Sequence, residues 1–119
     1  MVKGTIQIFD LEAYVLFDPG ATHSFVSPSF ACKLLKHVKP TMLDKMLLIS
    51  TPINDSHLTE HVYRDCKMKI GGKEMAADLI LLNMSDFDVI LGMDWLAANN
   101  VVMDCRVKTL TFPEIDNLV

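Results

Sequence analysis

A single acid stands where an apolar segment of the chain gives way to a turn. Asp18 follows the apolar run Val15–Phe17 and directly precedes Pro19-Gly20. A charge at the end of a buried strand is costly unless something compensates it, so its position needs a reason. Asp, Pro and Gly are all common in turns, and one interpretation is an ordinary strand-ending turn. The other is an acid placed where two copies of the chain can meet.

A second candidate for chemistry is the segment His57-Leu58-Thr59-Glu60-His61, which matches the H-x-x-E-H pattern of a zinc peptidase. On a helix, the two histidines would lie one turn apart and could share a metal ion. The segment follows a turn that contains Pro52, however, and it continues into the alternating pattern of a strand. Residues four apart on a strand are separated by roughly 13 Å, too far for one zinc ion. We therefore predict no metal site in this segment.

The elements that must position these residues are mostly strands, because apolar and polar residues alternate along much of the chain. We predict strands over residues 5–9, 13–18, 46–50, 58–70, 74–82, 87–92, 101–105 and 109–112. Turns are predicted at Asp10-Leu11-Glu12 and at Gly71-Gly72. One helix is predicted to begin after a Ser27 cap, with Pro28 at its first position, and to end near residue 36. A second, short helix is predicted over residues 93–98. Strands of this kind usually close into a barrel or a sandwich.

Composition narrows the class of protein. The chain has 119 residues, and half of them are hydrophobic, which is enough for one domain with a hydrophobic core. We predict a single domain over residues 1–119, with the core of the domain at about residues 5–112. The net charge is −4 and the eleven basic residues are scattered, so we predict no binding of nucleic acid by this domain. A helix that spans a membrane needs about 20 apolar residues, and no apolar stretch of this sequence is nearly that long. The sequence also shows no signal peptide. Three widely spaced cysteines, Cys32, Cys66 and Cys105, suit reduced thiols.

Two segments read together indicate a family. The sequences VLFDPGATHSFVS and DFDVILGMDWLAANN resemble the retropepsins, and specifically the aspartic protease domain of plant Ty3/gypsy-type retrotransposon polyproteins. The resemblance extends from about Thr5 to Phe112 and is specific only when both segments are taken together. It implies an all-β fold, a small closed barrel of the retroviral-type aspartic protease (acid protease) fold with one or two short helices. It also implies that the chain is one domain of a longer polyprotein.

The resemblance implies a role for each part of these segments. Asp18 corresponds to the catalytic acid of the family. The active-site loop would continue through Pro19, Gly20, Ala21 and Thr22. A later apolar segment packs beneath this loop in the family, and it corresponds to Ile90, Leu91 and Gly92. The flap that covers the substrate corresponds to the polar turn of Ile53, Asn54, Asp55 and Ser56, for which the alternative is an ordinary hairpin loop.

The implied activity requires two carboxylates. Water attacks a peptide carbonyl when a base removes its proton and an acid stabilises the new oxyanion, and two nearby carboxylates that share one proton supply both functions. The chain contains one Asp-x-Gly sequence, at Asp18, whereas Asp94 and Asp104 do not precede a glycine. The second carboxylate would therefore come from a second copy of the chain in a two-fold symmetric homodimer.

Pro19 departs from the family pattern, in which Ser or Thr follows the catalytic acid. In the family this hydroxyl forms hydrogen bonds across the dimer axis, and proline has neither a hydroxyl nor an N–H. We expect a weaker dimer, and a catalytically weak or inactive protease-like binding module is the alternative to an active enzyme.

The resemblance implies two partners, a second copy of the chain and an extended peptide or polyprotein substrate, such as a Gag-Pol polyprotein. It implies no metal or organic cofactor, and we expect no membrane partner. The expected location is the cytoplasm, or virus-like particles within it, and the protein is not expected to be secreted.

Overall fold

The computed structural model describes residues 2–49, 57–104 and 109–111. Within these ranges the chain forms nine strands and two short helices. In chain order they are β1 (Val2–Ile8), β2 (Leu11–Phe17), β3 (Phe25–Val26), α1 (Pro28–Leu34), β4 (Thr41–Ile49), β5 (His57–Ile70), β6 (Lys73–Leu81), β7 (Val89–Leu91), α2 (Met93–Ala98), β8 (Val102–Asp104) and β9 (Thr109–Thr111).

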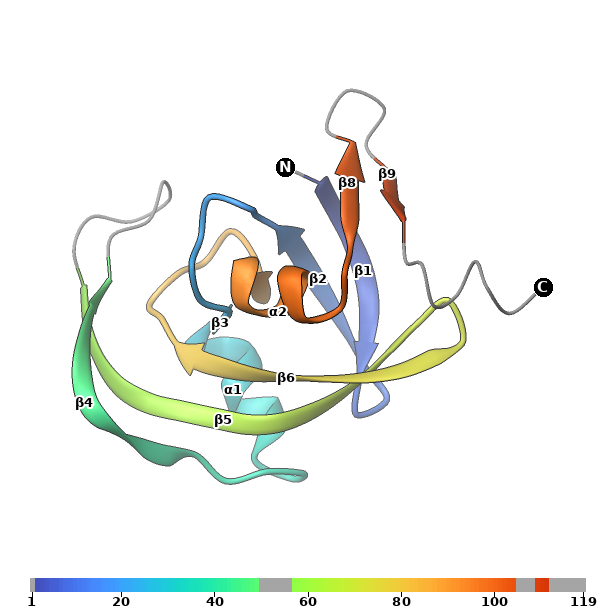
Figure 1. Ribbon diagram of the computed structural model, residues 1–119. Helices are drawn as coiled ribbons and strands as arrows, with labels where there is room; N and C mark the ends of the chain where they lie inside the picture. The colour runs from blue at the N-terminus through green and yellow to red at the C-terminus, as the bar shows by residue number, and fades with distance from the viewer. Residues whose placement is uncertain (1, 50–56, 105–108, 112–119) are drawn as a thin grey trace.

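Six strands close into a barrel. They follow the order β1-β2-β7-β3-β6-β5, and a short antiparallel pairing of β1 with β5 completes the ring through Gln7↔Lys69 and Ile8↔Met68. Figure 1 shows β5 and β6 curving around one side of this ring, with β4 along the outer edge of β5. The predicted all-β closed barrel with short helices is thus confirmed.

The ring contains two parallel pairings that the sequence analysis did not predict. β7 lies between β2 and β3, parallel to β2 and antiparallel to β3, and β3 runs parallel to β6. Because β2 and β3 flank the same strand, the segment 18–24 that joins them must pass around the end of β7. The two-residue strand β3 was missed because Phe25 and Val26 are too short a run to show any periodicity.

The first predicted turn is wrong in its position. The turn consists of Phe9 and Asp10, with φ of 50° and 72°, and β2 already begins at Leu11, which pairs with Ile8. Two central residues with positive φ match the right-handed twist of the flanking strands, as in the most common two-residue hairpins. Asp and Phe do not signal this conformation as clearly as Asn-Gly does. The predicted turn at Gly71-Gly72 is confirmed, since β5 and β6 pair from Ile70↔Lys73 onward.

The uninterrupted apolar runs in β2 and β7 are explained by burial on both faces of these strands. Alternate residues of each strand belong to two different clusters. Val15, Phe17, Val89 and Leu91 belong to the larger cluster, which α1 and α2 also join through Phe30, Leu34, Trp95 and Leu96. Leu16 and Ile90 belong to a second cluster together with Ala21, Phe25, Val62, Ile80, Leu82 and Met84.

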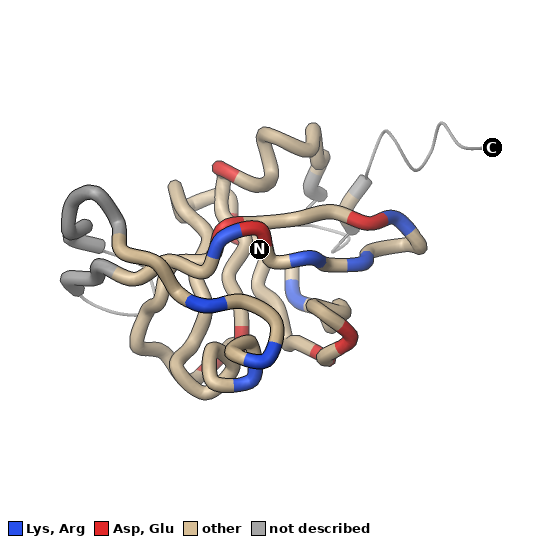
Figure 2. The backbone as a smooth tube through the Cα atoms, turned by 90° about the horizontal axis from the view of Figure 1, so that it is seen from below, with Lys and Arg blue, Asp and Glu red and all other residues tan. Residues whose placement is uncertain are grey.

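The start of α1 agrees with the sequence. The N–H of Phe30 donates to Ser27 Oγ (3.2 Å), and Pro28 occupies the first turn, as predicted. The helix ends at Leu34, slightly earlier than expected. None of the helices in the described ranges is long and apolar enough to cross a membrane. Over the same ranges, Lys and Arg are spread over several elements with Asp and Glu between them (Figure 2).

Candidate active site

Asp18 lies at the end of β2 and is buried, with only 3% of its surface exposed. The parallel pairing of β2 with β7 ends at Phe17↔Leu91. The N–H of Asp18 extends this ladder by one bond, because it donates to the carbonyl of Leu91 (2.9 Å). The pairing of two apolar strands therefore carries the acid inward, as the run Val15–Phe17 indicated.

The turn that follows is closed by hydrogen bonds to Asp18 itself. The N–H of Gly20 donates to Asp18 Oδ1 (2.8 Å), and the N–H of Ala21 donates to the Asp18 carbonyl (3.1 Å). A Cβ atom on Gly20 would lie 3.1 Å from Asp18 Oδ1, so glycine is what leaves room for the carboxylate. Pro19 supplies no N–H, and this turn does not need one from it.

Gly92 lets the loop pass directly over the end of β7. A Cβ atom at this position would lie 2.2 Å from the His23 carbonyl oxygen and 2.7 Å from that of Ala21. The next residue, Met93, donates its N–H to the same Ala21 carbonyl (2.7 Å). Ile90, Leu91 and Gly92 thus lie against the predicted active-site loop. The structure brings together the two segments that the sequence analysis paired.

Two residues at this site were missed. Ser24 is fully buried, and its Oγ accepts the N–H of Gly92 (3.0 Å) and donates to Asp94 Oδ1 (2.7 Å). Asp94 Oδ1 also accepts the N–H of Trp95 (2.7 Å) at the start of α2. The sequence analysis considered Asp94 only as a rival acid. The sequence did contain a signal for this pair. After each motif glycine, Gly20 and Gly92, a polar residue directly precedes an apolar segment. These polar residues are Ser24 and Asp94.

Part of the loop is open to solvent. Pro19, Gly20 and Thr22 are exposed, and Thr22 Oγ1 lies 2.9 Å from Nδ1 of the half-buried His23. The second apolar cluster continues from this loop through Ala21 and Phe25. The loop is therefore open to solvent on one side and anchored in the core on the other.

The predicted flap residues Ile53, Asn54, Asp55 and Ser56 lie outside the described residues. The strands on either side of them, β4 and β5, pair antiparallel up to Ile49↔His57. His57 to His61 form part of β5, so the prediction that this segment is a strand is confirmed. Within the described residues, no three His, Cys, Asp or Glu side chains form a group that could hold a metal ion.

The fold is that of retropepsin-like proteases. The retroviral protease-like domain of Ddi1 from Leishmania major superimposes with a TM-score of 0.67 at 17% identity, over 97% of this chain and 89% of that chain. The EIAV protease complexed with the inhibitor HBY-793 gives 0.56 at 16% identity, over 86% and 90%. The simian foamy virus (mac) protease gives 0.52 at 19% identity, over 80% and 91%.

The sequence gives the family. Residues 1–117 match the family described as "Retroviral aspartyl protease", and the chain therefore belongs to that family. No curated protein sequence shows a significant match. The predicted retropepsin-like family and fold are confirmed, and the plant Ty3/gypsy origin stays a prediction.

Proposed function

We propose that this protein is an aspartic endopeptidase that is active as a homodimer, with Asp18 of each subunit activating one water molecule. The observation that carries the proposal is the state of Asp18. Its carboxylate is buried at a strand end, and its loop is fastened to β7 by the bond from Asp18 N–H to the Leu91 carbonyl. An ordinary turn has no need to bury an acid in this way, because an unpaired buried charge is costly.

The chemistry follows from pairing two such acids. Two carboxylates held a few ångströms apart cannot both ionise cheaply, so they share one proton. The ionised member removes a proton from water while the protonated member donates to the oxyanion that forms. Asp94, the acid that follows Gly92 in the second motif, already accepts hydrogen bonds from Ser24 Oγ and from the N–H of Trp95. The second carboxylate then comes from a second copy of the chain, related by a two-fold axis.

The proposed substrate is an extended stretch of polypeptide, and its source is a junction in a Gag-Pol polyprotein that contains this domain. The quoted motifs around Asp18 and Gly92 support an origin in a plant Ty3/gypsy-type element. On this basis the domain would act in the cytoplasm or in virus-like particles.

A second candidate function is a protease-like binding module with little or no catalysis. The observation in its favour is Pro19, which offers no hydroxyl beside Asp18. Likeness to the protease-like domain of Ddi1 is compatible with either function, because identity of 17% bears on the fold alone.

The test combines association with cleavage. Sedimentation over a range of concentrations gives the monomer–dimer equilibrium, and digestion of a peptide library between about pH 4 and 7 gives activity. We expect activity per subunit to rise as dimer forms. Asp18→Asn should lower kcat by about a thousandfold or more, because it removes the acid–base group and keeps the shape. Asp10→Asn, in an exposed turn, is the matched control and should cleave like the parent.

The outcomes separate the two candidates. Cleavage by Asp18→Asn at the rate of the parent would show that the protease proposal is wrong. If the parent protein is folded but cleaves no peptide, the result would favour the binding module, whether the protein is a dimer or a monomer.

A further inference from the structure

Ser24 joins four segments of the chain at one buried point. Its backbone begins the turn into β3, and its carbonyl accepts the N–H of Ile80 on β6 (2.9 Å). Its hydroxyl accepts the N–H of Gly92 at the end of β7 and donates to Asp94 at the start of α2. A fully buried hydroxyl that is used both as donor and as acceptor is costly to remove, because its partners are then left without a bond.

Asp94 makes this junction stronger than a bond between neutral groups. The hydrogen bond from Ser24 Oγ to Asp94 Oδ1 measures 2.7 Å, and a hydrogen bond accepted by a carboxylate is stronger than one between neutral groups. The carboxylate lies in the first turn of α2, where a negative charge is favourable. Asp94 itself is exposed, so its removal need not disrupt the core.

The same short segment, Leu91–Asp94, also holds Asp18. The N–H of Asp18 donates to Leu91, while the N–H of Met93 donates to Ala21 in the middle of the loop. The loop is therefore hydrogen-bonded to this segment at three points. Asp18 bonds to its first residue, Leu91. Ala21 bonds to Met93, and Ser24 bonds to its last residue, Asp94. A shift of Gly92 or α2 would move the anchor of the Asp18 backbone.

We propose that Ser24 and Asp94 are positioning residues, which hold the Asp18 loop in its working geometry from within one subunit. The inference rests on the proposed function in that it takes Asp18 as the catalytic acid. Every bond in the junction joins residues of a single chain, so the junction needs no contact from a second subunit, and we infer that it forms before two subunits associate. It then reduces the ordering that dimer formation must achieve, and a displacement of about 1 Å at an acid–base group can cost up to about a hundredfold in rate.

The first test does not depend on catalysis. Amide hydrogen exchange is measured at Asp18, Ala21 and Met93, whose N–H groups hold the loop. Ser24→Ala and Asp94→Ala should speed local exchange at these amides by about tenfold, the size expected from the loss of a buried hydrogen bond. Asp94→Asn keeps an oxygen that can accept from Ser24 and should restore most of the protection. Protection in the parent should not depend on protein concentration.

Two matched controls separate positioning from general destabilisation. Ser27→Ala removes another buried serine hydroxyl that accepts a backbone N–H, that of Phe30. Asp78→Ala removes another exposed acid that accepts a backbone N–H, that of Asp65. Both should leave exchange at Asp18, Ala21 and Met93 unchanged once the change in global stability is subtracted. Equal effects from the controls and from Ser24→Ala and Asp94→Ala would overturn the proposal.

The second test is kinetic. Per folded dimer, Ser24→Ala and Asp94→Ala should lower kcat by about tenfold or more with little change in KM, because they affect the acid and not the substrate-binding surface. A changed exchange rate with kcat equal to that of the parent would reduce the pair to a structural role and refute positioning. If the parent cleaves no peptide, the proposed function fails while the exchange experiment still decides whether the pair orders the loop.

Discussion

Strand β2 carries an aspartate in the turn at each of its ends, and the two turns are built in opposite ways. Asp10 precedes the strand and is exposed, whereas Asp18 follows it and is 3% exposed. Both residues lie beside apolar segments and both occur in sequences that favour turns. The difference between them lies in what the rest of the chain contributes.

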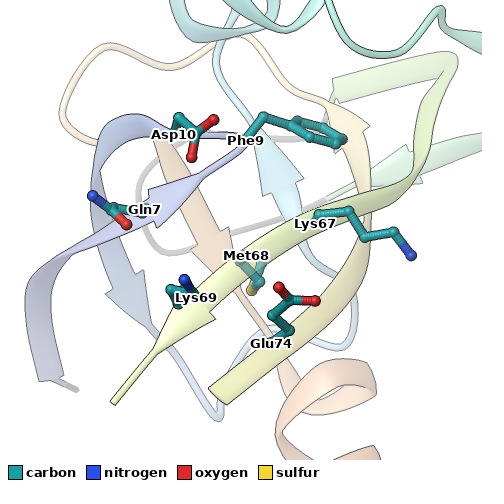
Figure 3. A pocket seen from close by; sticks show the side chains of 7 residues that line it. All are labelled: Gln7, Phe9, Asp10, Lys67, Met68, Lys69 and Glu74. Carbon is teal, nitrogen blue, oxygen red and sulfur yellow. The ribbon is translucent and has the colours of Figure 1, made fainter. Parts of the chain in front are cut away.

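The Asp10 turn is held mainly by the hairpin that it closes. Its one described backbone bond to another strand joins the N–H of Phe9 to the carbonyl of Lys67 (2.9 Å), and the Phe9 ring stacks on His37. A cavity of about 230 Å³ opens beside it, lined by charged groups of both signs (Figure 3), the residues being Gln7, Phe9, Asp10, Lys67, Met68, Lys69 and Glu74. Two acidic and two basic side chains line this open cavity, so their charges balance and all of them can be hydrated by solvent.

The Asp18 turn is instead enclosed by residues far along the chain. Leu91, Gly92, Met93 and Asp94 all contact the loop that begins at Asp18. An aspartate in a turn thus becomes a candidate catalytic group through the tertiary contacts that bury and hold it. The local sequence alone does not distinguish the two.

The largest effect is expected from a substitution at Gly92, which would disrupt the contacts that enclose the Asp18 turn. Its φ of −97° is open to any residue, so only space excludes a side chain there. Gly92→Ala would place a methyl group 2.2 Å from the His23 carbonyl oxygen and force the loop away. We expect a loss of about 3 kcal/mol or more in the free energy of unfolding, measured by urea denaturation.

Gly4→Ala is the matched control for this change. A Cβ atom on Gly4 would have nothing within 4 Å, and the residue lies in β1. Its substitution should change the free energy of unfolding by no more than about 0.5 kcal/mol. Equal stability of the two variants would mean that the loop does not pass over Gly92 as closely as described.

The sequence pointed to the candidate site because its apolar runs are unusual. Asp18 after Val15–Phe17 and Gly92 after Val89–Leu91 stand out because strands buried on both faces lose the alternation of polar and apolar residues. Two such runs, each followed by a motif residue, drew attention to these two segments, and the family resemblance implied that one packs beneath the other. The family resemblance then supplied the role of the acid.

The parts that escaped prediction depend on contacts between distant segments. Ser24 and Asp94 are common residue types, and only the close approach of the loop to α2 joins them. The parallel pairing of β3 with β6 involves two residues of β3, which gives no periodic signal. The position of the Phe9–Asp10 turn depends on positive φ values, which are uncommon for residues other than glycine, although Asp adopts them more often than most.

Cys66 is a second buried ionisable residue, and it differs from Asp18 in its surroundings. It belongs to the larger core cluster, and its thiol stays neutral at neutral pH. Burial raises the pKa of the Cys66 thiol to about 12 from its usual 9.0, with the carboxylates of Asp78 and Asp65 acting in the same direction. Its Sγ donates to the Tyr63 carbonyl (3.3 Å). A thiol with this pKa is a poor nucleophile at neutral pH.

The consequence for stability has a definite sign. Between pH 9 and about 12 the thiol is ionised in the unfolded chain and protonated in the folded one. The unfolded state then binds fewer protons, so the free energy of unfolding falls by about 1.4 kcal/mol per pH unit as the pH rises. Denaturation of the parent and of Cys66→Ala at pH 7, 8, 9 and 10 isolates this contribution. Parallel curves for the two proteins across pH 9–10 would contradict it.

The smallest expected effects concern two turns with positive φ, and the smaller of the two is at Asp10. Asp10 has φ of 72°, a conformation in which glycine has no steric cost. Asp10→Gly should therefore raise the free energy of unfolding by about 0.5 kcal/mol and leave peptide cleavage unchanged, because the side chain is not enclosed. The converse change is Gly72→Ala, at φ of 81° with open space around its Cβ position, which should lower stability by about 1 kcal/mol through the backbone alone. Both are measured by thermal and urea denaturation. A marked loss of stability in Asp10→Gly would mean that Asp10, like Asp18, is held by contacts that its exposure does not reveal.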